Sequence, residues 1–251
     1  MQTAVSPYYL HWASQGFGGS GKSHFLLTAP EPIWIALFDT KGIQPLLKKD
    51  EFKKKDIRWR EYSFNPGKLA PEDRPQAAKD NLAQFIDDYQ TALKHARTIG
   101  FDKEDKVYQV LRYARLEKAT GKPASYGELN LEYQSWFADA AEAGVNLGAI
   151  RGMKEDWGQN EKGSPVGLGT FSARGQLEVN EIVQVVLHHS WDDDTRAFKV
   201  RIGGQPGDDP KCRVGPATEL IGTEYDNLDF ETLAMMLYPE TADDMSVWGF
   251  E

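Results

Sequence analysis

The sequence predicts an α/β protein in which a mostly parallel central sheet lies between helices. A glycine-rich stretch, Gly16–Ser23, separates a predicted strand from a predicted helix. Six apolar residues, Ile33–Phe38, lack the alternation of a half-buried strand and therefore indicate a strand buried on both faces. Two further strands, Thr98–Asp102 and Val145–Ile150, each follow a predicted helix, and this alternation is typical of a parallel sheet.

Length and composition favour a single soluble domain. The 251 residues suit one α/β domain, which we assign to residues 1–238, followed by an acidic tail at 239–251. No apolar run approaches the roughly 18 residues of a membrane span, and no basic-then-apolar leader begins the chain. A lone cysteine, Cys212, excludes an internal disulfide framework. We therefore expect a cytoplasmic protein without membrane contact. Its net charge of −9 argues against an overall basic coat for nucleic acid but leaves room for basic loops.

The glycine-rich loop, Gly16–Ser23, matches the phosphate-binding pattern G-x-x-x-x-G-K-[ST] in full. Its glycines permit backbone angles at which successive N–H groups point inward at phosphate oxygens. Lys22 would place a positive charge at the β- and γ-phosphates, and the Ser23 hydroxyl would ligate Mg²⁺. A flexible loop without a ligand is the alternative, but the full pattern favours nucleotide binding. The predicted nucleotide-binding residues are Gly16, Phe17, Gly18, Gly19, Ser20, Gly21, Lys22, Ser23, His24 and Asp39.

Asp102 ends the predicted strand Thr98–Asp102 at the edge of the sheet where open α/β proteins bind ligands. A carboxylate in that place can hold Mg²⁺ through water, as the Walker B aspartate does. Many strands end in aspartate, so this interpretation depends on the place of the strand in the chain, after a phosphate-binding loop. The sequence therefore predicts a metal site made by Ser23 and Asp102.

The other elements follow from apolar spacing and from breaker residues. The expected helices are 22–27, 76–96, 107–118, 129–143 (capped by Gly144) and 230–237. The further expected strands are 8–13, a short edge strand near 59–64, and a hairpin of 182–191 and 196–202. Segments 48–75, 157–175 and 203–216 are rich in charge, glycine or proline, and 157–175 is expected to be a long mobile loop.

The chain resembles a RecA-like P-loop NTPase core, and more narrowly the phage-encoded RecA-like ATPases associated with single-strand annealing and recombination. The segments that carry the resemblance are Gly16–Ser23, Ile33–Gly42, Thr98–Asp102, Gly144–Trp157 and Leu177–Ile202. The resemblance implies binding of ATP and Mg²⁺, and action on single-stranded DNA in the host cytoplasm. It also implies assembly into a ring or filament with nucleotide near subunit contacts. A single-strand-binding or annealing protein is a candidate partner.

Two lysines depart from the family pattern. RecA-like enzymes usually carry a glutamate that orients the attacking water, two residues after the aspartate that ends strand two; here that residue is Lys41. The other common place, directly after the Walker B aspartate, holds Lys103, and Glu104 is the nearest carboxylate that could replace it. We therefore expect nucleotide binding with slow hydrolysis.

Three cations are further catalytic candidates, beside Lys22 and Glu104. Arg151 ends the strand in which the family places a residue that senses the γ-phosphate, although a solvated arginine at a strand end is equally consistent. Lys199 and Arg201 are two residues apart in a strand and share one face. The resemblance makes them candidates for a Lys-x-Arg finger that reaches a neighbour's phosphate; an ordinary exposed strand face is the alternative.

Two groups of cationic and aromatic side chains are candidates for single-stranded DNA binding, which requires backbone-tracking charges and stacking rings. Either group could equally be a solvated face. The first group is Arg112, Arg115, Lys118, Lys122 and Tyr126; the second is Lys162, Phe171 and Arg174.

Three functions fit these features. The first is an ATPase that acts on single-stranded DNA in recombination or replication. The second is a nucleotide-dependent assembly protein with little hydrolysis, which Lys41 and Lys103 make credible. The third is a small-molecule P-loop kinase, although the glycine-rich segments lack the arginine-rich lid that such kinases use. A GTPase is disfavoured because the sequence has no Asn-Lys-x-Asp motif.

Overall fold

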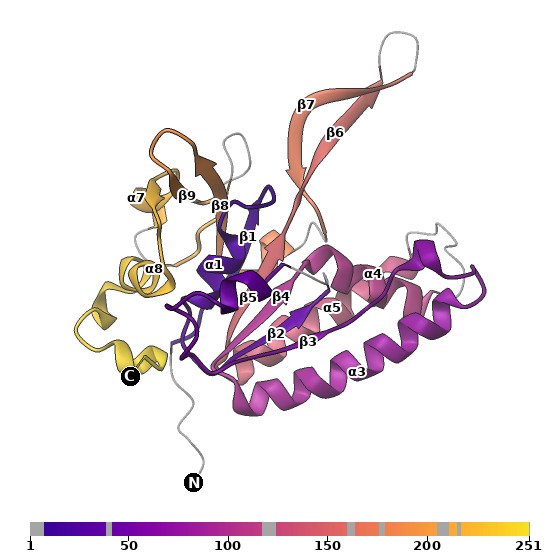
Figure 1. The fold of residues 1–251 in the computed structure, drawn as a ribbon, viewed down its shortest axis with the longest axis horizontal. Coiled ribbons are helices and arrows are strands. Elements are labelled where there is room, and N and C mark those ends of the chain that lie inside the picture. The colour runs from indigo at the N-terminus through magenta and orange to yellow at the C-terminus, as the bar shows by residue number, and fades with distance from the viewer. Residues whose placement is uncertain are drawn as a thin grey trace.

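The computed structural model describes residues 8–38, 42–116, 124–159, 164–175, 179–204, 211–214 and 217–250. Within these ranges the strands form an eight-stranded sheet in the order β10-β9-β8-β1-β5-β4-β2-β3 and a separate two-stranded ribbon (Figure 1). The strands of the sheet are β1 (His11–Gly16), β2 (Ile33–Leu37), β3 (Ile57–Glu61), β4 (Thr98–Asp102), β5 (Asn146–Arg151), β8 (Val185–Asp192), β9 (Ala197–Ile202) and β10 (Glu224–Asp226). Strands β8, β1, β5, β4, β2 and β3 are parallel, and β9 is antiparallel to both of its neighbours, β8 and β10. The predicted α/β class, the mostly parallel sheet and the C-terminal hairpin are confirmed.

Helices cover both faces of the sheet, and each face has its own core. Neighbouring residues of β1 belong to different cores. Ala13 packs in the core under α3, α4 and α5, whereas Trp12 packs in the core under α1 and α8. This two-sided burial explains why the central strands have no polar alternation. The helices are α1 (Lys22–Leu27), α2 (Gln44–Leu47), α3 (Arg74–His95), α4 (Glu104–Arg115), α5 (Ala124–Glu142), α6 (Val179–Ile182), α7 (Ala217–Leu220) and α8 (Phe230–Leu237). The described helices include none that is both long and apolar enough to cross a membrane.

Strand β1 begins three residues later than the aromatic run at 8–13 indicates. It includes Ser14 and Gln15, which are fully buried, and the ring of His189 lies within hydrogen-bond distance of the Ser14 hydroxyl (3.0 Å). Buried polar residues at the end of a strand hide that end from a hydrophobic pattern.

The expectation that residues 157–175 form a long mobile loop is wrong. Met153–Gln159 (β6) and Pro165–Ala173 (β7) form an antiparallel ribbon that projects from the body (Figure 1). The glycines that favoured a loop make room for neighbouring side chains. A Cβ at Gly158 would meet the Leu168 side chain at 2.8 Å, and one at Gly167 would meet the Glu155 carboxylate at 2.4 Å.

The C-terminal segment, expected as an acidic tail, packs on the body of the protein. Its two 3₁₀ turns, Pro239–Thr241 and Met245–Trp248, bury the Trp248 indole completely. The guanidinium of Arg97 donates hydrogen bonds to the carbonyls of Trp248 (2.6 Å), Gly144 (3.0 Å) and Tyr8 (3.1 Å). Arg97 thereby links the C-terminal segment to Tyr8, which precedes β1, and to Gly144, which precedes β5.

Candidate functional site

The parallel strands bring the predicted site to one edge of the sheet. Gln15 at the end of β1 pairs with Arg151 of β5, and Asp102 of β4 pairs with Ile150 of β5. The glycine-rich loop, Arg151 and Asp102 therefore lie at the carboxyl ends of three adjacent strands, where open α/β sheets bind ligands.

Two glycines of the glycine-rich loop occupy places that no other residue could fill. A Cβ at Gly16 would lie 2.2 Å from the His189 carbonyl oxygen. Gly21 has a φ of +91°, and a Cβ there would lie 2.8 Å from the Phe198 ring. At Gly18 and Gly19 a Cβ would meet nothing within 4 Å. The loop is thus tightly held at its two ends and open over its middle.

Lys22 closes the glycine-rich loop on itself. Its Nζ donates hydrogen bonds to the carbonyl oxygens of Gly16 (2.8 Å) and Phe17 (2.5 Å) and to the Ser20 hydroxyl (3.3 Å). Burial lowers the pKa of Lys22 to about 8; the charge of Lys103 adds to this, and that of Asp102 opposes it. The ammonium group therefore sits where an added anion would relieve an unfavourable charge.

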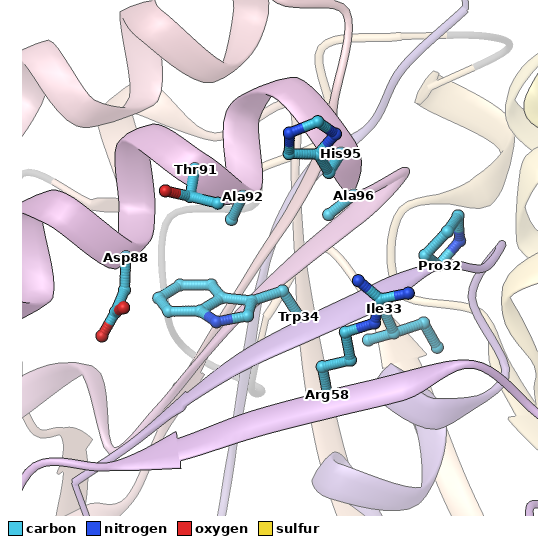
Figure 2. A pocket seen from close by; sticks show the side chains of 9 residues that line it. All are labelled: Pro32, Ile33, Trp34, Arg58, Asp88, Thr91, Ala92, His95 and Ala96. Carbon is cyan, nitrogen blue, oxygen red and sulfur yellow. The ribbon is translucent and has the colours of Figure 1, made fainter.

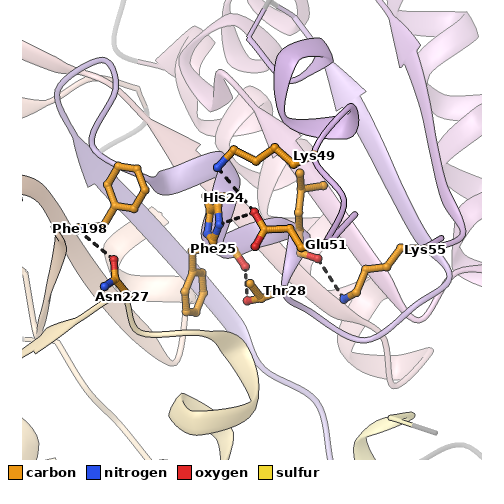
Figure 3. Close-up of polar contacts among 9 residues, drawn as sticks. His24, Phe25, Thr28, Lys49, Glu51, Lys55, Phe198 and Asn227 are labelled. Carbon is orange, nitrogen blue, oxygen red and sulfur yellow. Dashed lines mark hydrogen bonds and ion pairs between the residues drawn. The ribbon is translucent and has the colours of Figure 1, made fainter. Parts of the chain in front are cut away.

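The helix after the glycine-rich loop, α1, is fixed by the segment that follows α2 (Figure 3). Lys55 donates to the carbonyls of Leu27 and Ala29 at the end of α1, both at 3.0 Å. The His24 ring approaches the Glu51 carboxylate at 3.1 Å and packs against Phe52 and Phe198. His24, a predicted nucleotide contact, is thus engaged with Glu51.

The predicted metal ligands lie on two elements of this edge. Ser23 is half-buried in the first turn of α1, and the Asp102 side chain is buried at the end of β4. Asp39 and Lys41 lie outside the described residues. Within the described ranges, no three His, Cys, Asp or Glu side chains converge as a ligand set. A metal at this edge would therefore depend on Ser23, Asp102 and the phosphates of a bound nucleotide.

Glu104 and Arg151 form a buried ion pair, with exposed fractions of 0 % and 1 % and a distance of 3.4 Å between Oε2 and Nε. The Tyr133 hydroxyl donates to Glu104 (2.8 Å), and Arg151 donates to Asn180 Oδ1 (2.7 Å) and to the Arg174 carbonyl (2.7 Å). Burial, and then the Glu104 charge, raise the pKa of Tyr133 well above its usual range. The interpretation of Arg151 as a solvated arginine is wrong: this network joins α4, α5 and α6 to β5.

Lys199 and Arg201 face away from the glycine-rich loop. Phe198 packs toward Gly21, so the alternation along β9 directs Lys199 and Arg201 to the other face of the strand. Lys199 Nζ pairs with Asp226 at 2.6 Å and with Asp192 at 3.6 Å, and the hydrogen bond to Asp226 raises its pKa. Arg201 donates to the Gly204 carbonyl at 2.6 Å.

The two predicted DNA-binding groups lie on different elements. Arg112 lies 5.6 Å from the Tyr113 ring centroid on α4, and Arg115 makes two hydrogen bonds to Glu132 of α5, at 2.9 and 2.6 Å. Tyr126 packs partly against the core beneath α5. Lys118, Lys122 and Lys162 lie outside the described residues. The described members of the first group thus lie on α4 and α5, and Arg115 is already paired with Glu132.

The two described members of the second group, Phe171 and Arg174, lie at the base of the β6–β7 ribbon. The Phe171 ring contacts Phe17 of the glycine-rich loop edge-to-face, with centroids 5.0 Å apart, and Arg174 donates to the Met153 carbonyl (2.9 Å). The ribbon also exposes Trp157 and Leu168, which the expectation of a loop missed. The alternation of Val166, Leu168 and Thr170 was the available signal, hidden by the intervening glycines.

Comparisons with known proteins do not assign this site. No protein-family model matches the chain. A search of curated proteins likewise finds no match.

Proposed function

We propose that this protein binds ATP and Mg²⁺ at the glycine-rich loop, as a RecA-like P-loop ATPase that acts on single-stranded DNA. The observation that carries the proposal is the loop's geometry. A full phosphate-binding pattern joins a buried strand to a helix, with Lys22 aimed into the loop and Asp102 at the same edge. The open space over Gly18 and Gly19 fits a phosphate chain.

The chain's own residues would act mainly by binding and positioning. Lys22 would give up its hydrogen bonds to the loop carbonyls and bind phosphate oxygens instead. Their negative charge would stabilise the buried ammonium group. Ser23 would ligate Mg²⁺, and Asp102 would hold it through water. The bound metal would neutralise phosphate charge.

A slow rate of hydrolysis is part of the proposal. Glu104, the nearest replacement for the missing water-orienting glutamate, is held by Arg151 and Tyr133 away from solvent. Loss of a positioning base typically costs about 10²–10⁴ in rate. This observation also favours the second candidate, a nucleotide-dependent assembly protein with little hydrolysis.

Assembly is proposed on the geometry of β9. Lys199 and Arg201 face away from the glycine-rich loop of their own subunit, so as a finger they would complete a neighbour's site in a homo-oligomeric ring or filament. In a mixture of Arg201→Ala and Lys22→Ala subunits, each variant supplies what the other lacks. Recovered turnover in the mixture would support the finger; an inactive mixture of wild-type-like oligomers would exclude it.

Mg-ATP binding by Lys22→Ala tests the central claim. We expect binding to be lost, whereas Lys54→Ala, which removes an exposed lysine, should bind as wild type does. Unchanged affinity in Lys22→Ala would refute the proposed site. Measuring ATP turnover with and without single-stranded DNA then separates the candidates. Stimulation supports the DNA-dependent ATPase, and binding with negligible turnover supports the assembly protein.

A further inference from the structure

A hollow of about 580 Å³ lies at the carboxyl ends of β2 and β3, where α3 and α4 begin. Phe38 follows β2, Ser63, Phe64, Asn65 and Lys68 follow β3, and Lys106 lies in the first turn of α4. Its volume falls within the roughly 300–1,000 Å³ that small-molecule pockets usually have.

This hollow is separate from the glycine-rich loop. Strands β5 and β4 lie between β1 and β2, so three strand spacings, about 14 Å, separate the two places along the sheet edge. Both lie at the ligand-binding edge of the sheet. The nucleotide that we propose at the glycine-rich loop therefore leaves this hollow free.

The opposite end of the same layer offers a comparison. Figure 2 shows the indole of Trp34 between α3 and the start of β2, with Arg58, Asp88 and His95 around it. That hollow is about 120 Å³ and carries charges of both signs. It is too small for a nucleotide and has no preference for an anion.

Aromatic walls give the larger hollow a rigid apolar lining. Phe38 stacks on Tyr62 with centroids 5.0 Å apart, and Phe64 meets Tyr113 edge-to-face at 5.3 Å. Both phenylalanines are half-buried, so each ring is fixed on one side and keeps exposed surface on the other. Fixed rings of this kind provide stacking surface for a planar base.

The polar groups of the hollow favour an anion. Lys68 and Lys106 form no ion pair with any described residue, and no carboxylate is among the described residues that line it. Lys106 donates to Gln109 Oε1 at 3.0 Å, which leaves its charge uncompensated. Asn65 Oδ1 accepts from the Gly67 amide (3.2 Å), so the Asn65 NH₂ group remains a donor. Two free positive charges are notable in a chain of net charge −9.

We propose that this hollow binds a nucleotide, with its base against the two phenylalanine rings and its phosphate at Lys68 and Lys106. A free nucleoside monophosphate and one unit of a single strand share this chemistry. The site does not require the glycine-rich loop, so it stands or falls separately from the proposed function.

The experiment uses the full chain carrying Lys22→Ala, which removes the loop lysine. Calorimetry with thymidine monophosphate measures the free nucleotide, and anisotropy of a labelled oligothymidylate measures the strand. Ser63→Trp fills the hollow from an exposed position, and the double change Lys68→Glu/Lys106→Glu reverses its charge. Lys94→Glu, an exposed lysine at the other end of α3, is the control for charge reversal.

We expect the monophosphate to bind despite Lys22→Ala, to weaken at least about tenfold on charge reversal, and to be lost in Ser63→Trp. Lys94→Glu should change nothing. If the oligonucleotide is lost in the same variants and competes with the monophosphate, the occupant is a unit of a strand. If the oligonucleotide is unaffected, the occupant is a free nucleotide. The proposal is overturned if neither probe binds in a way that depends on Ser63→Trp and the charge reversal, provided that thermal unfolding shows the variants folded.

Discussion

Replacing Lys22 by methionine should make the protein's stability less dependent on alkaline pH. Folding lowers the pKa of Lys22 from 10.5 to about 8, so in this window the unfolded chain binds more protons than the folded one. The charged lysine therefore destabilises the fold at neutral pH, and this penalty disappears as pH rises from about 8 to 10.5. A shift of about 2.5 units, at 1.36 kcal/mol each, corresponds to about 3 kcal/mol.

The assay is urea unfolding at several pH values between 7 and 10.5. The free energy of unfolding of Lys22→Met minus that of wild type should fall by about 3 kcal/mol across this range, whatever the lost hydrogen bonds to the glycine-rich loop cost. Lys94→Met, which replaces an exposed lysine, should remain parallel to wild type. Parallel curves for Lys22→Met and wild type would show that Lys22 is not desolvated and would refute the reasoning.

Three further changes test the packing around the site, each by chemical denaturation. Glu104→Gln should cost about 3–5 kcal/mol because it leaves Arg151 buried without its partner; a loss below about 1 kcal/mol would contradict a buried pair. Gly21→Ala should destabilise by at least about 1–2 kcal/mol because of its left-handed backbone, whereas Gly18→Ala, which has open space, should cost less. Trp248→Ala should cost about 3–5 kcal/mol if the C-terminal segment is part of the core, and almost nothing if it is a loose tail.

Local signals predicted the parts of the fold that local residues determine. Helix α1, strand β4 and helix α8 have the predicted bounds. In α8 the reason is visible, because Asp229 caps the helix by accepting a hydrogen bond from the Thr232 amide (2.8 Å). The glycine-rich loop was found for the same reason: its pattern is contiguous in the sequence.

Features that depend on distant partners escaped the sequence. Glu104 and Arg151 lie on separate elements, and nothing near either residue indicates that they pair in the core. The β6–β7 ribbon was missed because its glycines have a meaning only beside the side chains that lie over them, such as Leu168 over Gly158. Composition indicates a flexible loop there, and cross-strand pairing overrides it.

The edge-to-face contact between Phe17 and Phe171 joins the glycine-rich loop to the β6–β7 ribbon. Lys22 donates a hydrogen bond to the Phe17 carbonyl, and the Phe17 ring contacts Phe171 of the ribbon. A ligand that binds Lys22 would remove this hydrogen bond and so free the residue that contacts the ribbon. Linkage is reciprocal: whatever free energy a ligand at the glycine-rich loop adds to binding at the ribbon, a partner at the ribbon adds to binding at the loop. The Phe17–Phe171 contact is therefore the place at which a change in the glycine-rich loop would reach the ribbon.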